Sequence, residues 1–337
     1  MLKRFTPVVR AADAGGNKTS RLISICRAFA VLLIVGLLPG VARATDGDSP
    51  LSGLAGGANK PVIMVKLDNT ALARPHTGLV DADLVYVEQV EWGLTRLAAM
   101  FSSKLPKVVG PVRSGRISDL EILKQFSAPG LVFSGANKVL LKQIAVSNAV
   151  SMSPKEVGKY YYRNSKKEVP HNQMLKLASM IAKSKGLGVV GDIGFTFDAA
   201  VPDGGTATKT FKAVWPSAII SGIWSKGGWA ISVDGYVQKD YVTRQPVIAK
   251  TVVIQFVEQN ESKQGDRFGG KTPLSRTVGV GSAIILRNGQ RYLATWSRPI
   301  ATSGTAFLVD GLPFSFNVGQ VWILLVDEKK MGSVSLK

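Results

Sequence analysis

The chain of 337 residues contains a single cysteine, Cys26, and two histidines. Cys26 precedes the apolar run AFAVLLIVGLLPGVA at 28–42, so a chain cleaved after this run has no cysteine. Disulfide bonds, thiolate catalysis and cysteine-ligated zinc are then excluded. Such a protein must hold its fold together by burial alone.

Motifs for metal and cofactor chemistry are also missing. The sequence has no EF-hand loop and no HExxH, and it has no GxSxG, P-loop or dinucleotide glycine pattern between a strand and a helix. Carboxylates are numerous in the first half, but their spacing matches no metal site. They are Asp68, Asp81, Asp83, Glu88 and Glu91. We therefore predict neither a metal nor a cofactor.

Acidic residues are few compared with basic ones. The chain has 42 Lys and Arg against 23 Asp and Glu, a net charge of +19. Residues 45–337 keep 35 basic and 22 acidic residues, which leaves +13. Outside a cell, such a protein meets anionic wall polymers or lipid headgroups, and export makes nucleic acid an unexpected partner. Alternatively, the charge serves only to keep the surface solvated.

The N-terminal sequence is typical of export. A basic stretch precedes the apolar run, and Ala42-Arg43-Ala44 supplies small residues for a signal peptidase, so a signal peptide at 1–44 is predicted. The apolar run is shorter than the roughly 20 residues that span a bilayer. Retention as an uncleaved anchor is the alternative, and it would keep the protein near the membrane. Residues 45–60, rich in Gly, Ser and Asp, are predicted to be a flexible linker.

The rest of the chain predicts an α+β protein of two domains, with a boundary within 198–208. Residues 61–200 are expected to form a mixed α/β domain that opens with a strand at 61–68. The runs LVYVEQVE and LTRLAAMF predict a hairpin, although a helix over 81–101 also fits their apolar spacing.

Three helices are predicted next in this first domain. The first begins at a capping box formed by Ser118 and Glu121. The second follows SGAN at 134–137, and the third has Asn172 as its N-cap and ends near Gly186.

Residues 205–337 are predicted to form an antiparallel β domain. Short runs of alternating apolar residues recur, and Asn288-Gly289 between two of them indicates a two-residue hairpin turn. The stretch NESKQGDRFGGKTPLSR at 260–276 is expected to be a polar loop.

The stretch VGPVRSGRISDLE at 109–121 places Arg113 and Arg116 just before a helix start. Free N–H groups and planar guanidinium groups together favour carboxylate or phosphate. We therefore predict an anion receptor, for which a structural ion network of these arginines with Glu88, Glu91 or Asp119 is the alternative. His171 is interpreted either as bracing a helix start or as a catalytic base.

Five sequence blocks resemble the YerB-like family, whose two halves are called DUF3048. They are VKLDNTALARPHTGL, ADLVYVEQVE, WGLTRLAAMF, VGPVRSGR and YYYRNSKKEVPHN, in the family's order, and the likeness covers 61–185. LATWSRP and VGQVWILLV resemble the second half more loosely. The resemblance implies a bacterial exported protein, in many members a lipoprotein, but here no cysteine follows the apolar run.

The resemblance also implies one shared site. Its residues here are Asp68, Asn69, Arg74, Glu91, Arg96, Arg113, Ser114, Arg116, His171 and Asn172. Phe133-Ser134-Gly135-Ala136 stands where family members often have His-Ala-Gly-Gly, which argues for binding over catalysis. We therefore expect an exported envelope protein that binds an anionic wall polymer or peptidoglycan fragment. The rival hypothesis is an envelope hydrolase with His171 as base and Arg113 and Arg116 as anion stabilisers.

Overall fold

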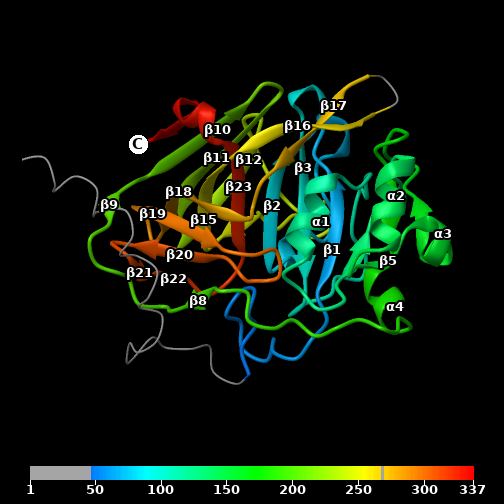
Figure 1. The fold of residues 1–337 in the computed structure, drawn as a ribbon, viewed down its shortest axis with the longest axis horizontal. Coiled ribbons are helices and arrows are strands. Elements are labelled where there is room, and N and C mark those ends of the chain that lie inside the picture. The colour runs from blue at the N-terminus through cyan, green and yellow to red at the C-terminus, as the bar shows by residue number, and fades with distance from the viewer. Residues whose placement is uncertain (1–46, 267–268) are drawn as a thin grey trace, which may run out of the picture. The chain divides into compact units, whose positions relative to one another are not determined.

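A computed structural model describes residues 47–266 and 269–337 (Figure 1). The expected signal peptide, its cleavage site and Cys26 lie outside these residues. The described residues all belong to one compact unit. None of the described helices is long and apolar enough to cross a membrane.

A twelve-stranded mixed sheet forms the centre of this unit (Figure 1). Across the sheet the strands follow the order β21 (Leu312–Pro313), β20 (Ala306–Val309), β19 (Gln290–Arg298), β18 (Gly279–Arg287), β15 (Thr251–Val257), β23 (Val321–Asp327), β2 (Leu84–Gln89), β3 (Thr95–Phe101), β1 (Ile63–Asp68), β4 (Gly130–Val132) and β5 (Val150–Ser151), with β9 (Thr206–Ala207) beside β19. Parallel pairs join β2 to β23, β23 to β15, β1 to β4 and β4 to β5, and the other pairs are antiparallel.

The central strands are apolar on both faces because both faces are covered. Every residue of β1 and of β15 is buried. Along β1, Ile63 and Val65 enter one hydrophobic core, and Met64 between them enters a second core on the opposite face. Lys66 follows the same alternation, so its side chain lies on the face of Met64.

A six-stranded sheet covers the first face through Phe211, Trp215 and Trp229. Its strands are β10 (Thr210–Trp215), β11 (Ala218–Ser225), β12 (Gly228–Val233), β13 (Tyr236–Val237), β14 (Ile248–Ala249) and β24 (Val334–Leu336). Three pairs of short strands complete the set: β6 (Tyr161–Arg163) with β7 (Gln173–Leu175), β8 (Thr196–Phe197) with β22 (Ser315–Phe316), and β16 (Gln259–Gly265) with β17 (Lys271–Ser275).

The helices are short and lie in the first half of the chain. They are α1 (Ile117–Leu123), α2 (Lys138–Ala145), α3 (Pro154–Val157) and α4 (Leu177–Ile181). Leu123 of α1 and Leu140 of α2 cover the second face of the sheet. Single 3-10 turns are η1 (Ala71–Ala73), η2 (Leu79–Asp81), η3 (Glu91–Gly93), η4 (Gly158–Tyr160) and η5 (Glu328–Ser333).

The structure agrees with the expected α+β class only in part. It contains both helices and strands, but strands dominate and the fold is closer to mainly β. Two hairpins are confirmed, β2–β3 and β18–β19, and in the second one Asn288 and Gly289 both have positive φ. Strands from both halves of the chain share the large sheet. Where the chain divides into domains stays a prediction.

Four local expectations differ from the structure. The third helix spans only Leu177–Ile181, and Asn172 precedes β7 instead of capping a helix. The N-cap of α1 is Arg116, whose N–H binds Asp119, so the Ser118–Glu121 capping box is wrong. The polar stretch 260–276 contributes most of the β16–β17 hairpin. Within the expected linker, Leu51 is fully buried against the second core.

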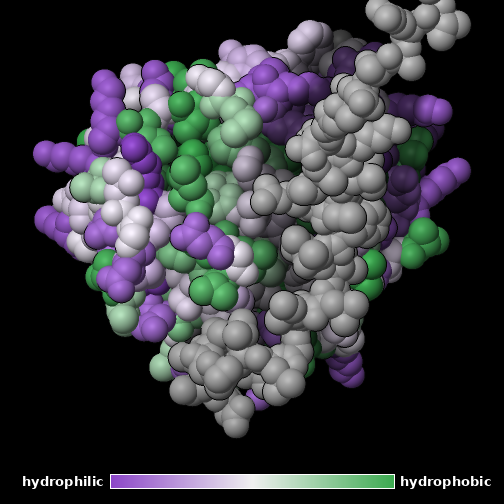
Figure 2. Space-filling model, turned by 60° about the vertical axis from the view of Figure 1, so that its left-hand side comes forward, coloured by the Kyte–Doolittle hydropathy of each residue, from purple (hydrophilic) through white to green (hydrophobic). Residues whose placement is uncertain are grey.

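One side of the molecule exposes apolar side chains among polar ones (Figure 2). On β18 and β19, Val280 is 76% exposed and Leu293 is 75% exposed. Residues 277–313 contain no lysine, so this apolar surface is not bordered by lysines from its own strands.

Truncating a side chain at the join of the two halves should destabilise the whole unit. Leu324 lies in β23, fully buried between β2 and β15. We expect Leu324→Ala to lower the free energy of unfolding by about 2–5 kcal/mol, measured by urea denaturation, because it leaves a cavity. The control Leu312→Ala removes a 58% exposed side chain and should have little effect. Two unfolding steps with only one shifted would contradict a shared core.

Candidate functional site

A cavity of about 720 Å³ gathers three of the predicted arginines. Its walls come from η3, β3, the loop before α1, the loop before α2 and the β16–β17 hairpin. The lining residues are Glu91, Arg96, Arg113, Ser114, Arg116, Gly135, Ala136, Asn137, Pro170, Gly265, Asp266 and Thr272. Five of the ten residues that the family resemblance places in one site line this cavity: Glu91, Arg96, Arg113, Ser114 and Arg116.

Backbone hydrogen bonds hold the arginine loop in place. The Arg113 N–H donates to the Lys66 carbonyl at 2.8 Å, and the Gly115 N–H donates to the Gly135 carbonyl at 3.0 Å. Gly110 begins the loop with φ of 153°, and a Cβ there would lie 2.9 Å from the Gln173 carbonyl oxygen. Only glycine fits this position without strain.

Arg116 is already compensated by a carboxylate. Its Nη2 lies 2.5 Å from Glu91 Oε2, and Nη1 donates to the Gly115 carbonyl at 2.8 Å. Glu91 also accepts a hydrogen bond from the Thr272 hydroxyl of the hairpin. Burial raises the pKa of Glu91, but its bonds to Arg116 and Thr272 outweigh burial and leave the pKa below its ordinary value. Glu91 is therefore charged, and it ties the hairpin to the arginine.

The charge of Arg113 is partly compensated by a carboxylate that contacts only its Nε. Its Nε lies 3.0 Å from Asp68 Oδ2, and the side chain is 25% exposed. No hydrogen bond from Nη1 or Nη2 reaches another described residue. The same Asp68 oxygen lies 2.6 Å from His171 Nδ1. Burial raises the pKa of Asp68, but His171, Arg113 and Arg96 together bring it below the ordinary value.

Of the three arginines that line the cavity, Arg96 is the one without a carboxylate partner among the described residues. Its Nη1 donates to the Ser114 carbonyl at 2.9 Å, and no described Asp or Glu oxygen lies within ion-pair distance. Burial and the charge of Arg116 lower the pKa of Arg96 to about 9, so it remains charged at neutral pH. A charge held in this setting favours an anion beside it.

A buried charge cluster lies next to this loop, and the sequence analysis missed its centre. Lys66 Nζ is 2.7 Å from Glu88 Oε1 and 2.6 Å from Asp119 Oδ1, and none of the three is more than 1% exposed. Asp119 Oδ2 also accepts the Arg116 N–H at 2.5 Å. The sequence feature that could have indicated this cluster is a lone lysine within the apolar run VIMVKL.

Five predicted site residues lie outside the cavity lining: Asp68 and His171, which contact each other, and Arg74, Asn69 and Asn172. Arg74 donates to the Val233 carbonyl and pairs with Asp234 at 2.6 Å, which ties η1 to the six-stranded sheet. Asn69 donates to the Thr95 hydroxyl at 2.9 Å. Asn172 accepts from Arg163 at 2.7 Å and braces the loop before β7.

The two histidines differ in exposure: His76 is buried, and His171 is partly exposed. His171 does not line the cavity, although its neighbour Pro170 does. His76 is 1% exposed, and its Nε2 lies 2.6 Å from the Asp68 carbonyl oxygen. Burial lowers the pKa of His76 to about 4, so the ring is neutral at physiological pH. Among residues 47–266 and 269–337, no three His, Cys, Asp or Glu side chains are grouped to hold a metal ion.

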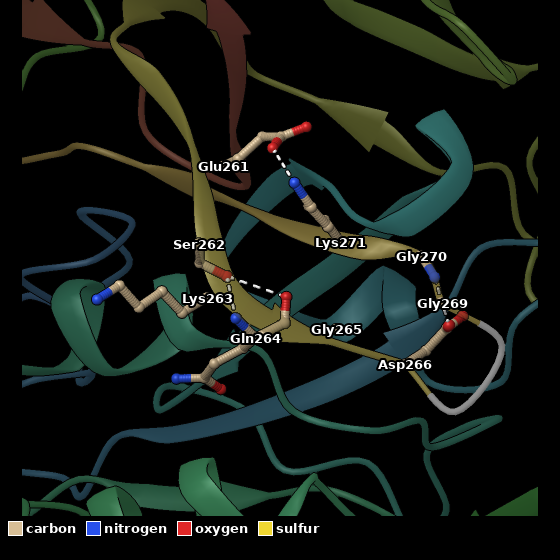
Figure 3. A pocket seen from close by; sticks show the side chains of 9 residues that line it. All are labelled: Glu261, Ser262, Lys263, Gln264, Gly265, Asp266, Gly269, Gly270 and Lys271. Carbon is tan, nitrogen blue, oxygen red and sulfur yellow. Dashed lines mark hydrogen bonds and ion pairs between the residues drawn. The ribbon is translucent and has the colours of Figure 1, made fainter.

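A second hollow, of about 460 Å³, runs along the β16–β17 hairpin (Figure 3). Its opposite charges face one another, with Lys271 Nζ 2.6 Å from Glu261 Oε2. Gly265 and Asp266 line both this hollow and the arginine cavity. The hairpin therefore contributes one wall of the cavity.

The Lys66 cluster predicts a specific pH dependence of stability. Burial and the charge of Asp119 raise the pKa of Glu88 from 4.5 to about 8. Between these values the folded state binds a proton that the unfolded chain does not, so stability falls as the pH rises through 8. Glu88→Gln removes this loss, because glutamine resembles the protonated acid. The melting temperature of the variant, relative to wild type, should rise between about pH 5 and 9.

The exposed Glu261→Gln variant is the matched control for this measurement. A difference between Glu88→Gln and wild type that stays flat with pH would show that Glu88 is charged in the folded protein.

Comparison with known proteins identifies the family. The model described as "Protein of unknown function (DUF3048) N-terminal domain" matches residues 51–190, and its C-terminal counterpart matches 223–323. "Putative lipoprotein YerB" of Bacillus subtilis (strain 168) is 25% identical over 297 residues, which cover 82% of this chain and 84% of YerB. The crystal structure of YerB from Bacillus subtilis has the same fold, with a TM-score of 0.71 and 22% identity over 86% of this chain and 99% of that one. The chain belongs to the DUF3048, or YerB-like, family.

Proposed function

We propose that the protein binds an anionic component of the bacterial cell envelope in the arginine cavity. The observation that carries the proposal is Arg96, a guanidinium in the cavity wall with no carboxylate partner among the described residues. Arg113 lies in the same wall, and its Nη1 and Nη2 form no hydrogen bond with a described residue. Two guanidinium groups with unused donors favour an oxyanion between them.

The charged side chains of the cavity wall indicate how much negative charge the ligand carries. Asp68 compensates Arg113 and Glu91 compensates Arg116, which leaves Arg96 unpaired among these five groups. The carboxylate of Asp266 also lines the cavity and accepts hydrogen bonds from Trp92 Nε1 and the Gly270 N–H. One unpaired guanidinium suits a ligand that presents a single carboxylate or phosphodiester at this point. Peptidoglycan stem peptides and phosphate-bearing wall polymers both carry such groups.

The envelope location rests on two supports. A related protein is named as a lipoprotein, and the first 44 residues of this chain are typical of an export signal. An envelope protein with a polar, arginine-lined cavity encounters anionic wall material directly.

The competing interpretation is a structural ion network. Arg113 and Arg116 each pair with one acid, as such a network requires. Arg96 does not fit this interpretation, because it has no ion-pair partner among the described residues. The unpaired arginine therefore favours binding.

Replacing Arg96 should weaken ligand binding without unfolding the protein. We expect Arg96→Gln to reduce affinity for soluble peptidoglycan fragments on the order of tenfold to a hundredfold, because one charged hydrogen bond is lost. Arg96→Lys keeps the charge and should lose less. Isothermal titration calorimetry measures both variants.

Arg244→Gln removes an exposed arginine outside the cavity and is the matched control. A melting temperature near that of wild type shows that Arg96→Gln folds. Equal affinity of Arg96→Gln and wild type, or no binding by either to peptidoglycan fragments or wall polymer, would sink the proposal.

One contact favours a second candidate, an envelope hydrolase. Asp68 Oδ2 lies 2.6 Å from His171 Nδ1, so Nε2 is available as a general base in the manner of an acid-oriented histidine. Arg113 and Arg116 are then placed to stabilise a developing oxyanion. Against this candidate, His171 itself does not line the cavity.

Hydrolysis has a direct test. The wild-type protein is incubated with purified sacculi, and released fragments are measured by liquid chromatography. If His171 is the base, His171→Ala should reduce release at least about a hundredfold, because general-base catalysis contributes this much. Release that persists in His171→Ala contradicts the assignment, and an absence of release by wild type removes hydrolysis of this substrate.

A further inference from the structure

Positive charge is concentrated in one segment of the chain. Residues 138–185 contain ten Lys and Arg against two Glu, a net charge of +8. Residues 45–337 as a whole carry +13, so these 48 residues account for more than half of the excess. The other residues of that range are close to balanced.

The helices α2, α3 and α4 of this segment lie at the end of the large sheet where β5 is the edge strand (Figure 1). We call six of the segment's exposed lysines, which lie on or next to α2, α3, η4 and α4, the basic face. They are Lys138, Lys142, Lys155, Lys159, Lys183 and Lys185. None of them forms an ion pair with a described residue. Lys159, Lys183 and Lys185 line one hollow of about 460 Å³ together with β5.

Helix α2 adds apolar side chains to the basic face. Only Leu140 and Ile144 of its eight residues are buried. Val139 is 57% exposed, and Val146, directly after the helix, is 86% exposed. The helix contains no acidic residue. It therefore presents aliphatic groups beside lysines along most of its surface.

We propose that the basic face docks the protein onto an anionic lipid bilayer. Lysines near such a surface are attracted to acidic headgroups, and neighbouring aliphatic side chains enter the boundary between headgroups and acyl chains. A soluble polyanion would use the lysines but would leave the exposed valines in water. The combination of both on α2 is what favours a bilayer over a polymer.

Docking at this face has a consequence for the arginine cavity. Asn137, the N-cap of α2, lines that cavity, and Lys138 follows it directly. A bilayer against α2 would therefore hold the cavity mouth close to the headgroups. The proposal does not depend on what the cavity binds.

The test measures contact with lipid at α2 itself, because the apolar sequence 28–42 of the full chain can enter a bilayer independently. A Cys26→Ser chain carries a polarity-sensitive fluorophore at Val146→Cys, or at Val280→Cys on β18 as the control position. Each protein is mixed with vesicles of phosphatidylglycerol and phosphatidylcholine or of phosphatidylcholine alone, with spin-labelled lipid as quencher. We expect quenching only at position 146, only with phosphatidylglycerol, and its loss in high salt.

Charge variants identify the groups responsible. Replacing Lys138, Lys142, Lys155 and Lys159 by Gln should weaken the docking seen at position 146 by more than about tenfold, since each lysine contributes roughly fivefold. The control replaces four exposed lysines of the second half, which are Lys209, Lys212, Lys226 and Lys239. It removes the same charge and should change docking by less than about twofold.

Three results would overturn the proposal. They are equal quenching with neutral vesicles, equal docking by the two four-lysine variants, and a signal at position 146 with a soluble phosphate polymer but not with vesicles. The last would assign the face to wall polymer instead. Circular dichroism melting confirms that each variant is folded before it is scored.

Discussion

The ammonium group of Lys66, buried between Glu88 and Asp119, is the interaction on which the arginine cavity depends. It joins two strands of the large sheet to the first turn of α1. Asp119 in turn accepts the N–H of Arg116, so the cluster also fixes the start of the helix. Removing one partner of such a group is costly because it leaves a buried charge uncompensated. The cluster thus specifies one geometry for the loop, whatever its net contribution to stability.

The three arginines above this cluster have the same chemistry but different surroundings. Arg116 is held by Glu91, Arg113 touches Asp68 on one side, and Arg96 has only a carbonyl partner. Compensated arginines build the wall, and the uncompensated one is the group on which the proposed anion binding rests. This division of roles explains how one cavity combines a rigid structure with residual positive charge.

The cavity needs both halves of the chain. The β16–β17 hairpin reaches the first half through Thr272, whose hydroxyl binds Glu91, and through Ser275, whose N–H donates to the Ser118 hydroxyl. The parallel pairing of β2 with β23 places the halves in one sheet. The bilayer proposal concerns a neighbouring surface that begins at α2, whose N-cap Asn137 also lines the cavity.

Local sequence determined the family, the β2–β3 and β18–β19 hairpins and the arginine-bearing loop, because turn residues and strand alternation act over a few neighbours. It did not determine the length of the third helix, the N-cap of α1 or the pairing of β16 with β17, which depend on packing against distant strands. The acid that each arginine meets, and the burial of Lys66, were likewise decided only by tertiary structure. Ion pairing depends on the distance between side chains in space, and residues such as Arg116 and Glu91 become neighbours only when the sheet has assembled.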